Sequence, residues 1–191
     1  MTFARTSKAN AALLAAREAG RYERYYLALA ARAPEPVEGS WHWSIAQDPR
    51  DPRRRVALNP GSKKGDQAES GYRVIGTVAQ AALLLLRPKT GRTHQLRVHA
   101  AQAGAPLLGD RQYAGPMQCT LANGRVLRAG RVLLHCARVR LPSIEVGAGA
   151  SPVTSDTLLT LTIDASVPED FGSLWQQLGG DPSQLDPRAW G

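Results

Sequence analysis

The feature that most constrains the fold is an apolar stretch that runs directly into a turn and a helix. Residues 71–88, GYRVIGTVAQAALLLLRP, are rich in aliphatic and β-branched side chains and end at Pro88. This pattern predicts two strands, or one strand with a tight connection. The turn KTGRT follows, and helical spacing then predicts a helix over residues 94–103, closed by Gly104. Leu96, Ala100 and Ala103 share one face of that helix, which suits packing on a sheet.

Weaker patterns complete the predicted architecture. The mixture of helices and strands predicts an α+β domain with a mixed or antiparallel sheet. Residues 33–70 are rich in Pro, Gly and charge, which predicts a long excursion with one short strand around SWHWSIA. The other expected elements are a helix over 8–19, begun by Thr6 or Ser7 and ended by Gly20, strands over 24–32, 131–140 and 156–163, and a helix near the C-terminus.

Charge is distributed unevenly along the 191 residues. The net charge is +8, although five acids and a single base follow from Asp164 onward. We therefore expect residues 1–165 to form the folded, basic part of the chain and residues 166–191 to be an acidic tail, solvated and weakly ordered. A basic body favours a polyanionic partner.

Two cysteines, Cys119 and Cys136, indicate no disulfide framework and favour a reducing compartment. No apolar run approaches the length of a membrane span, and the N-terminus has no uninterrupted apolar signal-peptide core. A cytoplasmic protein without membrane contact is the resulting expectation.

Basic and hydrogen-bonding residues are densest in residues 87–115. Gly91 lies where the chain turns sharply toward the helix, a place that often requires positive φ. Arg92 and Thr93 stand at the helix start, where free N–H groups favour an anion. His94 and Arg97 are three residues apart and so share a face, predicted to point into a cleft.

The guanidinium of an arginine held in such a cleft has a planar fork of donors that suits a carboxylate or a phosphate. A zinc site is disfavoured, because His94 and His99 are five residues apart and no C-x-x-C motif accompanies them. The pattern predicts anion recognition and no metal.

The segment TGRTHQLRVHAAQAGAPLLGDRQYAG closely resembles the signature of the RluA-type RNA pseudouridine synthases. That signature runs T-G-R-x-H-Q-[IL]-R-x-H and continues as G-x-P-[IL]-x-G-D-x-x-Y-G. One small departure is Ala114, which precedes Gly115. The matching residues are Thr90, Gly91, Arg92, His94, Gln95, Arg97, His99, Gly104, Pro106, Gly109, Asp110 and Tyr113.

Three other segments carry the same resemblance, which covers roughly residues 1–165. RYYLALA resembles the family's K-x-Y-x-A strand, with Arg24 at the lysine position and Tyr26 at the active-site tyrosine. AESGYRVI resembles its A-x-T-x-Y strand, with Ser70 in place of threonine. LLHCARVRLP resembles the later L-H-A strand, with Cys136 before Ala137.

The resemblance implies isomerisation of uridine to pseudouridine in ribosomal or transfer RNA, without an external cofactor. Tyr26 would stack on the target base and assist proton removal, and Arg97 would pair with the family's catalytic aspartate. The implied RNA-binding residues are Arg24, Lys89, Arg92 and His94. For Gly91, Gly109, Asp110 and Tyr113 the expected role is structural, with a direct role in the site as the alternative for Asp110 and Tyr113. The chain is expected to be a monomer.

The catalytic aspartate is the point of departure from the family. In the family it lies in H-R-L-D-x-x-T-S-G, and D-x-x-T-S-G does not occur in this chain. An ungapped alignment on Tyr26 places that aspartate roughly six or seven residues before Met1. Asp110 is not expected to replace it, because family members carry both residues.

Three alternatives follow from this departure. The chain is a synthase that lacks its N-terminal part and is inactive alone, or it is a non-catalytic RNA-binding relative. The third is a basic domain with a chance motif, which agreement over several segments disfavours. Whether the chain by itself is an enzyme stays open at this stage.

Overall fold

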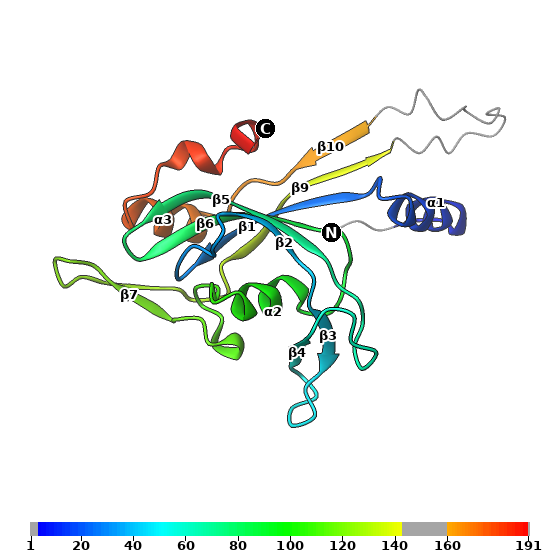
Figure 1. Cartoon of the computed structure of the whole chain (residues 1–191). Helices are drawn as coiled ribbons and strands as arrows, with labels where there is room; N and C mark the ends of the chain where they lie inside the picture. The colour runs from blue at the N-terminus through cyan, green and yellow to red at the C-terminus, as the bar shows by residue number, and fades with distance from the viewer. Residues whose placement is uncertain (1–3, 143–159, 191) are drawn as a thin grey trace.

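A six-stranded antiparallel sheet organises the chain in the computed structural model, which describes residues 4–142 and 160–190 (Figure 1). Every strand pairing among these residues is antiparallel, so the α+β prediction is confirmed in its antiparallel form. The strands stand in the order β10-β9-β1-β6-β5-β2. Their bounds are β1 Glu23–Ala30, β2 Glu38–Trp41, β5 Ser70–Val78, β6 Ala81–Pro88, β9 Leu134–Pro142 and β10 Thr160–Asp164.

The apolar stretch that dominates the sequence forms the β5–β6 hairpin. Val78 pairs with Ala81, so the two strands are joined by a tight turn, as predicted. Strand β6 is buried along almost its whole length because β1 and β5 flank it and both faces are covered. The expected strand over 24–32 is β1, which lies between β6 and β9 in the middle of the sheet.

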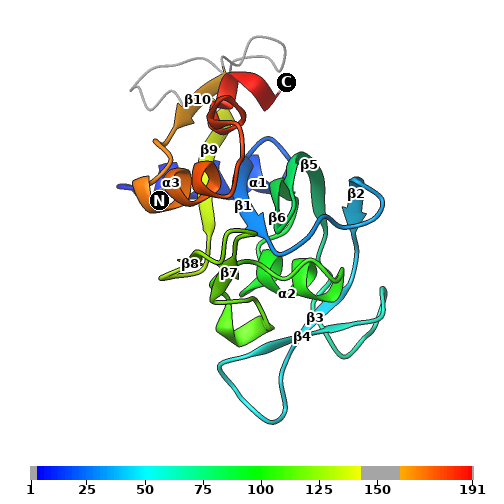
Figure 2. The same cartoon turned by 90° about the vertical axis from the view of Figure 1, so that its left-hand side faces the viewer.

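Helix α2, Gln95–Gln102, covers one face of the sheet (Figures 1 and 2). Leu96 and Ala100 pack in one cluster with Leu84 and Leu86 of β6, which confirms the predicted packing face. The helix ends before Gly104, whose φ of 74° reverses the chain direction, as expected.

Residues 33–70 contain more structure than their composition suggested. Besides β2, they form the two-stranded ribbon of β3, Ser44–Gln47, and β4, Arg55–Leu58, which projects from the α2 side of the sheet (Figure 2). A second ribbon, β7 Gln118–Thr120 with β8 Val126–Arg128, was not predicted. Strands of three or four residues are too short to show a clear alternation of apolar and polar side chains.

Helix α1, Ser7–Glu18, confirms the N-terminal prediction. The Thr6 hydroxyl oxygen accepts a hydrogen bond from the Ala9 N–H at 3.1 Å, a side-chain cap. Ala16 is the only residue of α1 that is buried. The helix is therefore attached to the sheet through little apolar surface.

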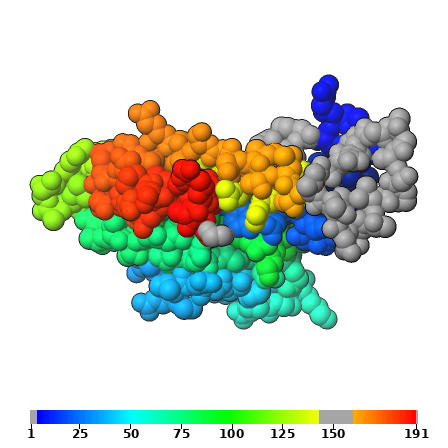
Figure 3. Space-filling model, turned by 90° about the horizontal axis from the view of Figure 1, so that it is seen from above, coloured from blue at the N-terminus to red at the C-terminus, as the bar shows by residue number. Residues whose placement is uncertain are grey.

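The helix expected near the C-terminus is confirmed, but the C-terminal segment differs from the prediction of a solvated tail. It forms α3, Glu169–Gln177, and the 3₁₀ helices η2, Pro182–Leu185, and η3, Pro187–Trp190. These elements cover the side of the sheet opposite α2 (Figure 1), and their surface faces the viewer in Figure 3. Phe171 and Trp175 are fully buried, and Trp190 is 4 % exposed. That expectation was wrong because the acidic charge of the segment hides its large apolar and aromatic side chains, which fill the second core.

The later strands fall close to their expected positions. The strand predicted over 131–140 is β9, shifted toward the C-terminus by a few residues. Of the strand predicted over 156–163, residues 156–159 lie outside the described part of the chain, and the rest belongs to β10. No helix among the described residues is long and apolar enough to cross a bilayer. Both cysteines are free thiols.

Candidate functional site

A cavity of about 160 Å³ opens where β1, the turn after β6 and the start of α2 meet. It brings together the expected catalytic and RNA-binding residues except Lys89, whose ammonium forms an ion pair with Glu69. Gly109, Asp110 and Tyr113, which were expected to be structural, do not line it. The lining residues are Arg24, Tyr26, Pro88, Thr90, Gly91, Arg92, His94, Gln95, Leu96, Arg97 and Leu134.

Tyr26 forms one wall of this cavity. It follows a β-bulge between Tyr25 and Tyr26 on the β9 side of β1, and its backbone pairs with Leu86 and Cys136. Burial raises the pKa of the Tyr26 hydroxyl, and the neighbouring Cys136 thiol raises it further. The phenol is therefore protonated at neutral pH, with its ring packed against the α2-side core.

The turn on the opposite wall is held by a buried glutamine. Gln95 Oε1 accepts hydrogen bonds from the Thr90 hydroxyl at 2.8 Å and from the Arg92 N–H at 2.9 Å. Its Nε2 donates to the Glu69 carbonyl at 2.8 Å and to the Ser70 hydroxyl at 2.9 Å. Gln95 thus fixes the turn to the start of β5, a role that its place in the motif did not reveal.

His94 adopts the left-handed conformation, with φ 58° and ψ 16°, immediately before α2. Its Nδ1 lies 2.8 Å from the Tyr113 hydroxyl, which also accepts the Arg55 N–H at 3.0 Å. Burial lowers the His94 pKa, and the positive charge of Arg97 lowers it further. A neutral His94 that accepts the tyrosine proton at Nδ1 carries its own proton on Nε2 as a donor.

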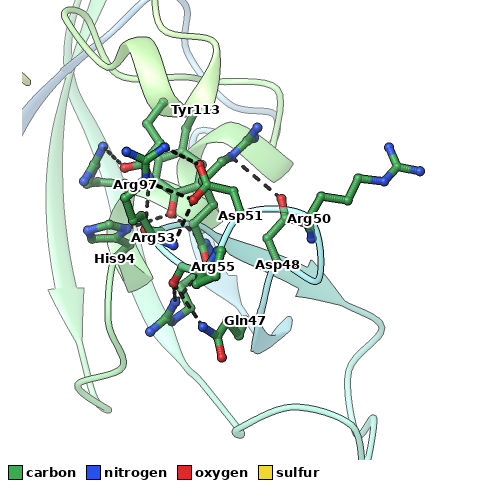
Figure 4. A network of polar contacts seen from close by, with 12 residues as sticks. Gln47, Asp48, Arg50, Asp51, Arg53, Arg55, His94, Arg97 and Tyr113 are labelled. Carbon is green, nitrogen blue, oxygen red and sulfur yellow. Dashed lines mark hydrogen bonds and ion pairs between the residues drawn. The ribbon is translucent and has the colours of Figure 1, made fainter.

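Arg97 belongs to the polar network of Figure 4 and is held by a buried carboxylate of this chain. Its Nε and Nη2 donate to the two Asp110 oxygens at 2.8 and 2.7 Å, and Nη2 also donates to Gln112. Asp110 is completely buried, and its hydrogen bonds raise the Arg97 pKa. The resemblance assigned Arg97 to another aspartate, whereas here Asp110 occupies its fork and Nη1 bonds to none of the described residues.

Tyr113 completes this cluster. Its ring is 6 % exposed, with the Arg97 guanidinium 4.8 Å from its centroid and that of Arg54 5.8 Å away. The Tyr113 N–H donates to Asp110 at 3.3 Å. Polar groups of α2, of the 3₁₀ helix η1, Arg111–Tyr113, and of the start of β4 therefore form one network beside the cavity.

Two glycines of the motif act differently from each other. The expected positive φ at Gly91 is contradicted, since among the described residues of this turn the left-handed conformation falls on His94. Gly109 has φ +77°, and a Cβ there would overlap the Arg131 carbonyl. Only Gly109 is required for its backbone conformation.

The β3–β4 ribbon adds a basic surface next to the cavity. An open hollow of about 500 Å³ lies between this ribbon, the loop after β4 and the α2 turn. Four cations line it, and Asp66 is the acid among its lining residues. Arg50 at the ribbon tip extends away from the network (Figure 4). The four cations are Arg55, Lys63, Lys64 and Arg92.

His99, the second histidine of the motif, is fully buried and bonds to protein atoms. Its Nδ1 lies 3.0 Å from the Ser70 hydroxyl and its Nε2 2.9 Å from the Trp43 carbonyl. Burial lowers its pKa. Nowhere in the described part of the chain do three His, Cys, Asp or Glu side chains cluster as metal ligands would.

The family model for RNA pseudouridylate synthase matches residues 1–102. The chain belongs to this family. The matched part includes β1 with Tyr26, the β5–β6 hairpin and α2 with Arg97, which together build the cavity.

Individual relatives agree with this assignment. RNA pseudouridine synthase 2, chloroplastic, from Arabidopsis thaliana is 41 % identical over 114 residues, which cover 56 % of this chain and 26 % of that protein. Ribosomal large subunit pseudouridine synthase D from Xylella fastidiosa is 32 % identical over 190 residues, which cover the whole chain and 54 % of that protein. The chain therefore spans about a quarter to about a half of these relatives.

The fold is shared with solved structures of the family. Human RNA Pseudouridylate Synthase Domain Containing 4 superposes with a TM-score of 0.63 at 19 % identity, over 91 % of this chain and 69 % of that one. This likeness supports the pseudouridine synthase fold, with its mainly antiparallel sheet.

Proposed function

We propose that the chain forms one side of a site that isomerises uridine in RNA, the side that carries the positive charges and holds the uracil. One observation carries the proposal: a single cavity combines the protonated Tyr26 phenol with three arginines and a histidine. An enzyme that rearranges a base in RNA has to take that base out of its stack and hold its phosphates. A cavity with an aromatic wall and a guanidinium-rich rim supports both requirements.

Within this proposal, Tyr26 stacks on the uracil and assists removal of the proton from its carbon, for which the hydroxyl has to give up its own proton as it takes the new one. The raised pKa of the hydroxyl keeps the ring uncharged when the base arrives. Arg24, Arg92 and His94 contact the ribose–phosphate backbone around the base. Lys89 joins them from the rim after release from Glu69, and cations of the β3–β4 ribbon extend the phosphate contacts.

Arg97 is proposed to hold the catalytic carboxylate. Asp110 fixes the guanidinium through Nε and Nη2, which leaves Nη1 for a second acceptor. Asp110 itself is a poor candidate for the reacting group, because both its oxygens are engaged and the side chain is fully buried. We retain structural roles for Gly91, Gly109, Asp110 and Tyr113.

The reacting carboxylate is proposed to come from outside these 191 residues, since D-x-x-T-S-G does not occur in them. The chain alone is then inactive in isomerisation. The alternative, a non-catalytic RNA-binding relative, is favoured by the same missing motif, and its affinity would come from phosphate contacts.

Two assays test the proposal. Fluorescence anisotropy with a stem-loop RNA should show binding that weakens steeply with salt. Release of tritium from [5-³H]uridine-labelled RNA, which follows bond formation at that carbon, should be absent for the chain alone. No salt-dependent RNA binding would contradict the proposed function, and turnover that survives Asp110→Asn would contradict the need for an outside carboxylate.

Arg97→Ala separates the two alternatives. In a protein that only binds RNA, the change should weaken binding modestly and make the salt dependence shallower. In a longer protein that isomerises uridine, it should almost abolish turnover while binding changes little. The names of the relatives favour ribosomal RNA as target. Transfer RNA as a target, the absence of a cofactor, a monomeric state and a cytoplasmic location remain proposals.

A further inference from the structure

Two arginines from different elements converge on the Gly91 turn. Arg17 belongs to the last turn of α1, and Arg24 lies on β1. A Cβ built on Gly91 would overlap Arg17 Nη2 and would lie 3.4 Å from Arg24 Nη2. Both guanidinium groups therefore reach the same small region above the turn. Arg17 had no role in the sequence-based prediction of the site.

The positive charges at this turn are not balanced by the described residues. Neither Arg17 nor Arg24 forms an ion pair within residues 4–142 and 160–190. Arg24 Nη2 donates to the Thr90 carbonyl at 2.9 Å, and its Nε is buried without a hydrogen-bond partner. Two like charges held this close repel each other, and an anion bound between them removes that cost.

The position of the pair indicates which anion fits. Arg24 and Gly91 line the cavity that holds Tyr26, so an anion at the turn lies next to whatever the phenol contacts. A guanidinium fork suits a carboxylate or a phosphate, and a phosphate can offer separate oxygens to two guanidinium groups that come from different elements. An RNA ligand carries such a phosphate beside every nucleotide.

We infer that Arg17 and Arg24 form a phosphate clamp at the Gly91 turn, which holds a phosphodiester next to the nucleotide in the Tyr26 cavity. The inference rests on the proposed function for its RNA ligand, although not for its phosphate chemistry. Gly91 is needed for space, since its φ is not positive and a side chain would displace Arg17. Because α1 buries only Ala16, the clamp also ties α1 to the bound strand.

The clamp is tested by RNA binding of Arg17→Ala and Gly91→Ala. Each change should weaken anisotropy-measured binding about tenfold at low salt, the effect of losing one charged hydrogen-bonding group. The salt slope should fall by about 0.7, as for one single-strand phosphate. The double variant should be no weaker than Arg17→Ala, because both changes remove the same contact.

Arg128→Ala is the matched control, since this exposed arginine lies on the β8 ribbon, at the opposite end of the molecule from α1 (Figure 1). It removes the same charge and should change binding less than about twofold. If the wild-type chain binds RNA and Arg17→Ala binds equally well, the clamp is wrong while the proposed function stands.

A second measurement separates RNA from free phosphate as the ligand. The Nε–H signals of Arg17 and Arg24 are followed by NMR during titration with inorganic phosphate and with a short RNA. Saturation by RNA at the lower concentration supports the inference. Saturation by inorganic phosphate alone overturns the assignment of RNA as the ligand. If neither signal shifts with either ligand, the clamp is wrong. This readout stays decisive even if stem-loop binding, and with it the proposed function, fails.

Discussion

Two buried polar residues, Asp110 and His99, hold the candidate site in place. Asp110 orients the Arg97 guanidinium and accepts from the Tyr113 N–H. His99 joins α2 to Ser70 at the start of β5 and to the Trp43 carbonyl. Neither side chain is exposed to solvent, so each acts on the site through the residues it positions. Substitution of either residue should therefore lower the free energy of unfolding, which can be measured without an activity assay.

Asp110→Asn tests the first of these contributions. The substitution preserves shape but leaves the Arg97 charge, 19 % exposed, beside a neutral amide. We expect the free energy of unfolding in urea to fall by about 2 to 3 kcal/mol. This is less than the usual cost of breaking a fully buried ion pair, because Arg97 is partly exposed. Asp186→Asn breaks an exposed pair with Arg188 and should change stability far less. Equal losses of unfolding free energy in the two variants would show that the buried Asp110–Arg97 pair stabilises the fold no more than an exposed pair does.

His99→Gln tests the second contribution through pH. Burial lowers the native pKa of His99 below the value of about 6.5 for an unfolded chain. The unfolded state then binds the proton more readily, so the free energy of unfolding should fall as the pH drops from 7 to 5.5. The slope of this decline should be smaller in His99→Gln than in the wild type. An unchanged slope would show that His99 does not titrate differently in the two states.

At the scale of elements, Gly109 lets the loop after α2 pass close to the backbone of Arg131, shortly before β9. Gly109→Ala combines a left-handed backbone with an overlap between Cβ and the Arg131 carbonyl. Gly124 has a similar φ of +80° with open space around it, so Gly124→Ala isolates the conformational cost of about 1 kcal/mol. Gly109→Ala should cost at least about 2 kcal/mol more in chemical denaturation. Similar losses for both would exclude the backbone overlap as a determinant.

The elements that sequence alone predicted are those with strong local signals. The β5–β6 hairpin and the packing face of α2 follow from apolar periodicity, and the grouping of Tyr26 with Arg97 follows from motif resemblance. The hydrogen bonds of Gln95 to Glu69 and Ser70 could not be predicted, nor could the approach of Arg17 to Gly91, because they join residues far apart in the chain. The Arg97–Asp110 ion pair was not predicted, because the motif indicates a turn at Asp110 and does not show that its carboxylate faces α2.

At the scale of the whole molecule, the sheet separates the proposed RNA-binding residues from the C-terminal segment that completes the second core. The Tyr26 cavity lies on the α2 face, because residues of α2 line it. The β3–β4 ribbon projects from the same side, whereas the C-terminal segment covers the other face (Figures 1 and 2). The segment is acidic, yet it contributes some of the largest side chains of its core. This arrangement keeps negative charge on the face away from the proposed RNA strand, where it weakens phosphate binding least.

Trp175→Ala tests this separation. Trp175 is fully buried, and its indole N–H donates to the Asp181 carbonyl at 3.0 Å. Its removal should lower the free energy of unfolding by about 3 to 5 kcal/mol, whereas Gln176→Ala, an exposed neighbour on α3, should change it by less than about 0.5 kcal/mol. At temperatures where the variant stays folded, its Kd for RNA should equal that of the wild type, because the cavity lies across the sheet. A weaker Kd in folded Trp175→Ala would show that the C-terminal segment shapes the site as well as the core.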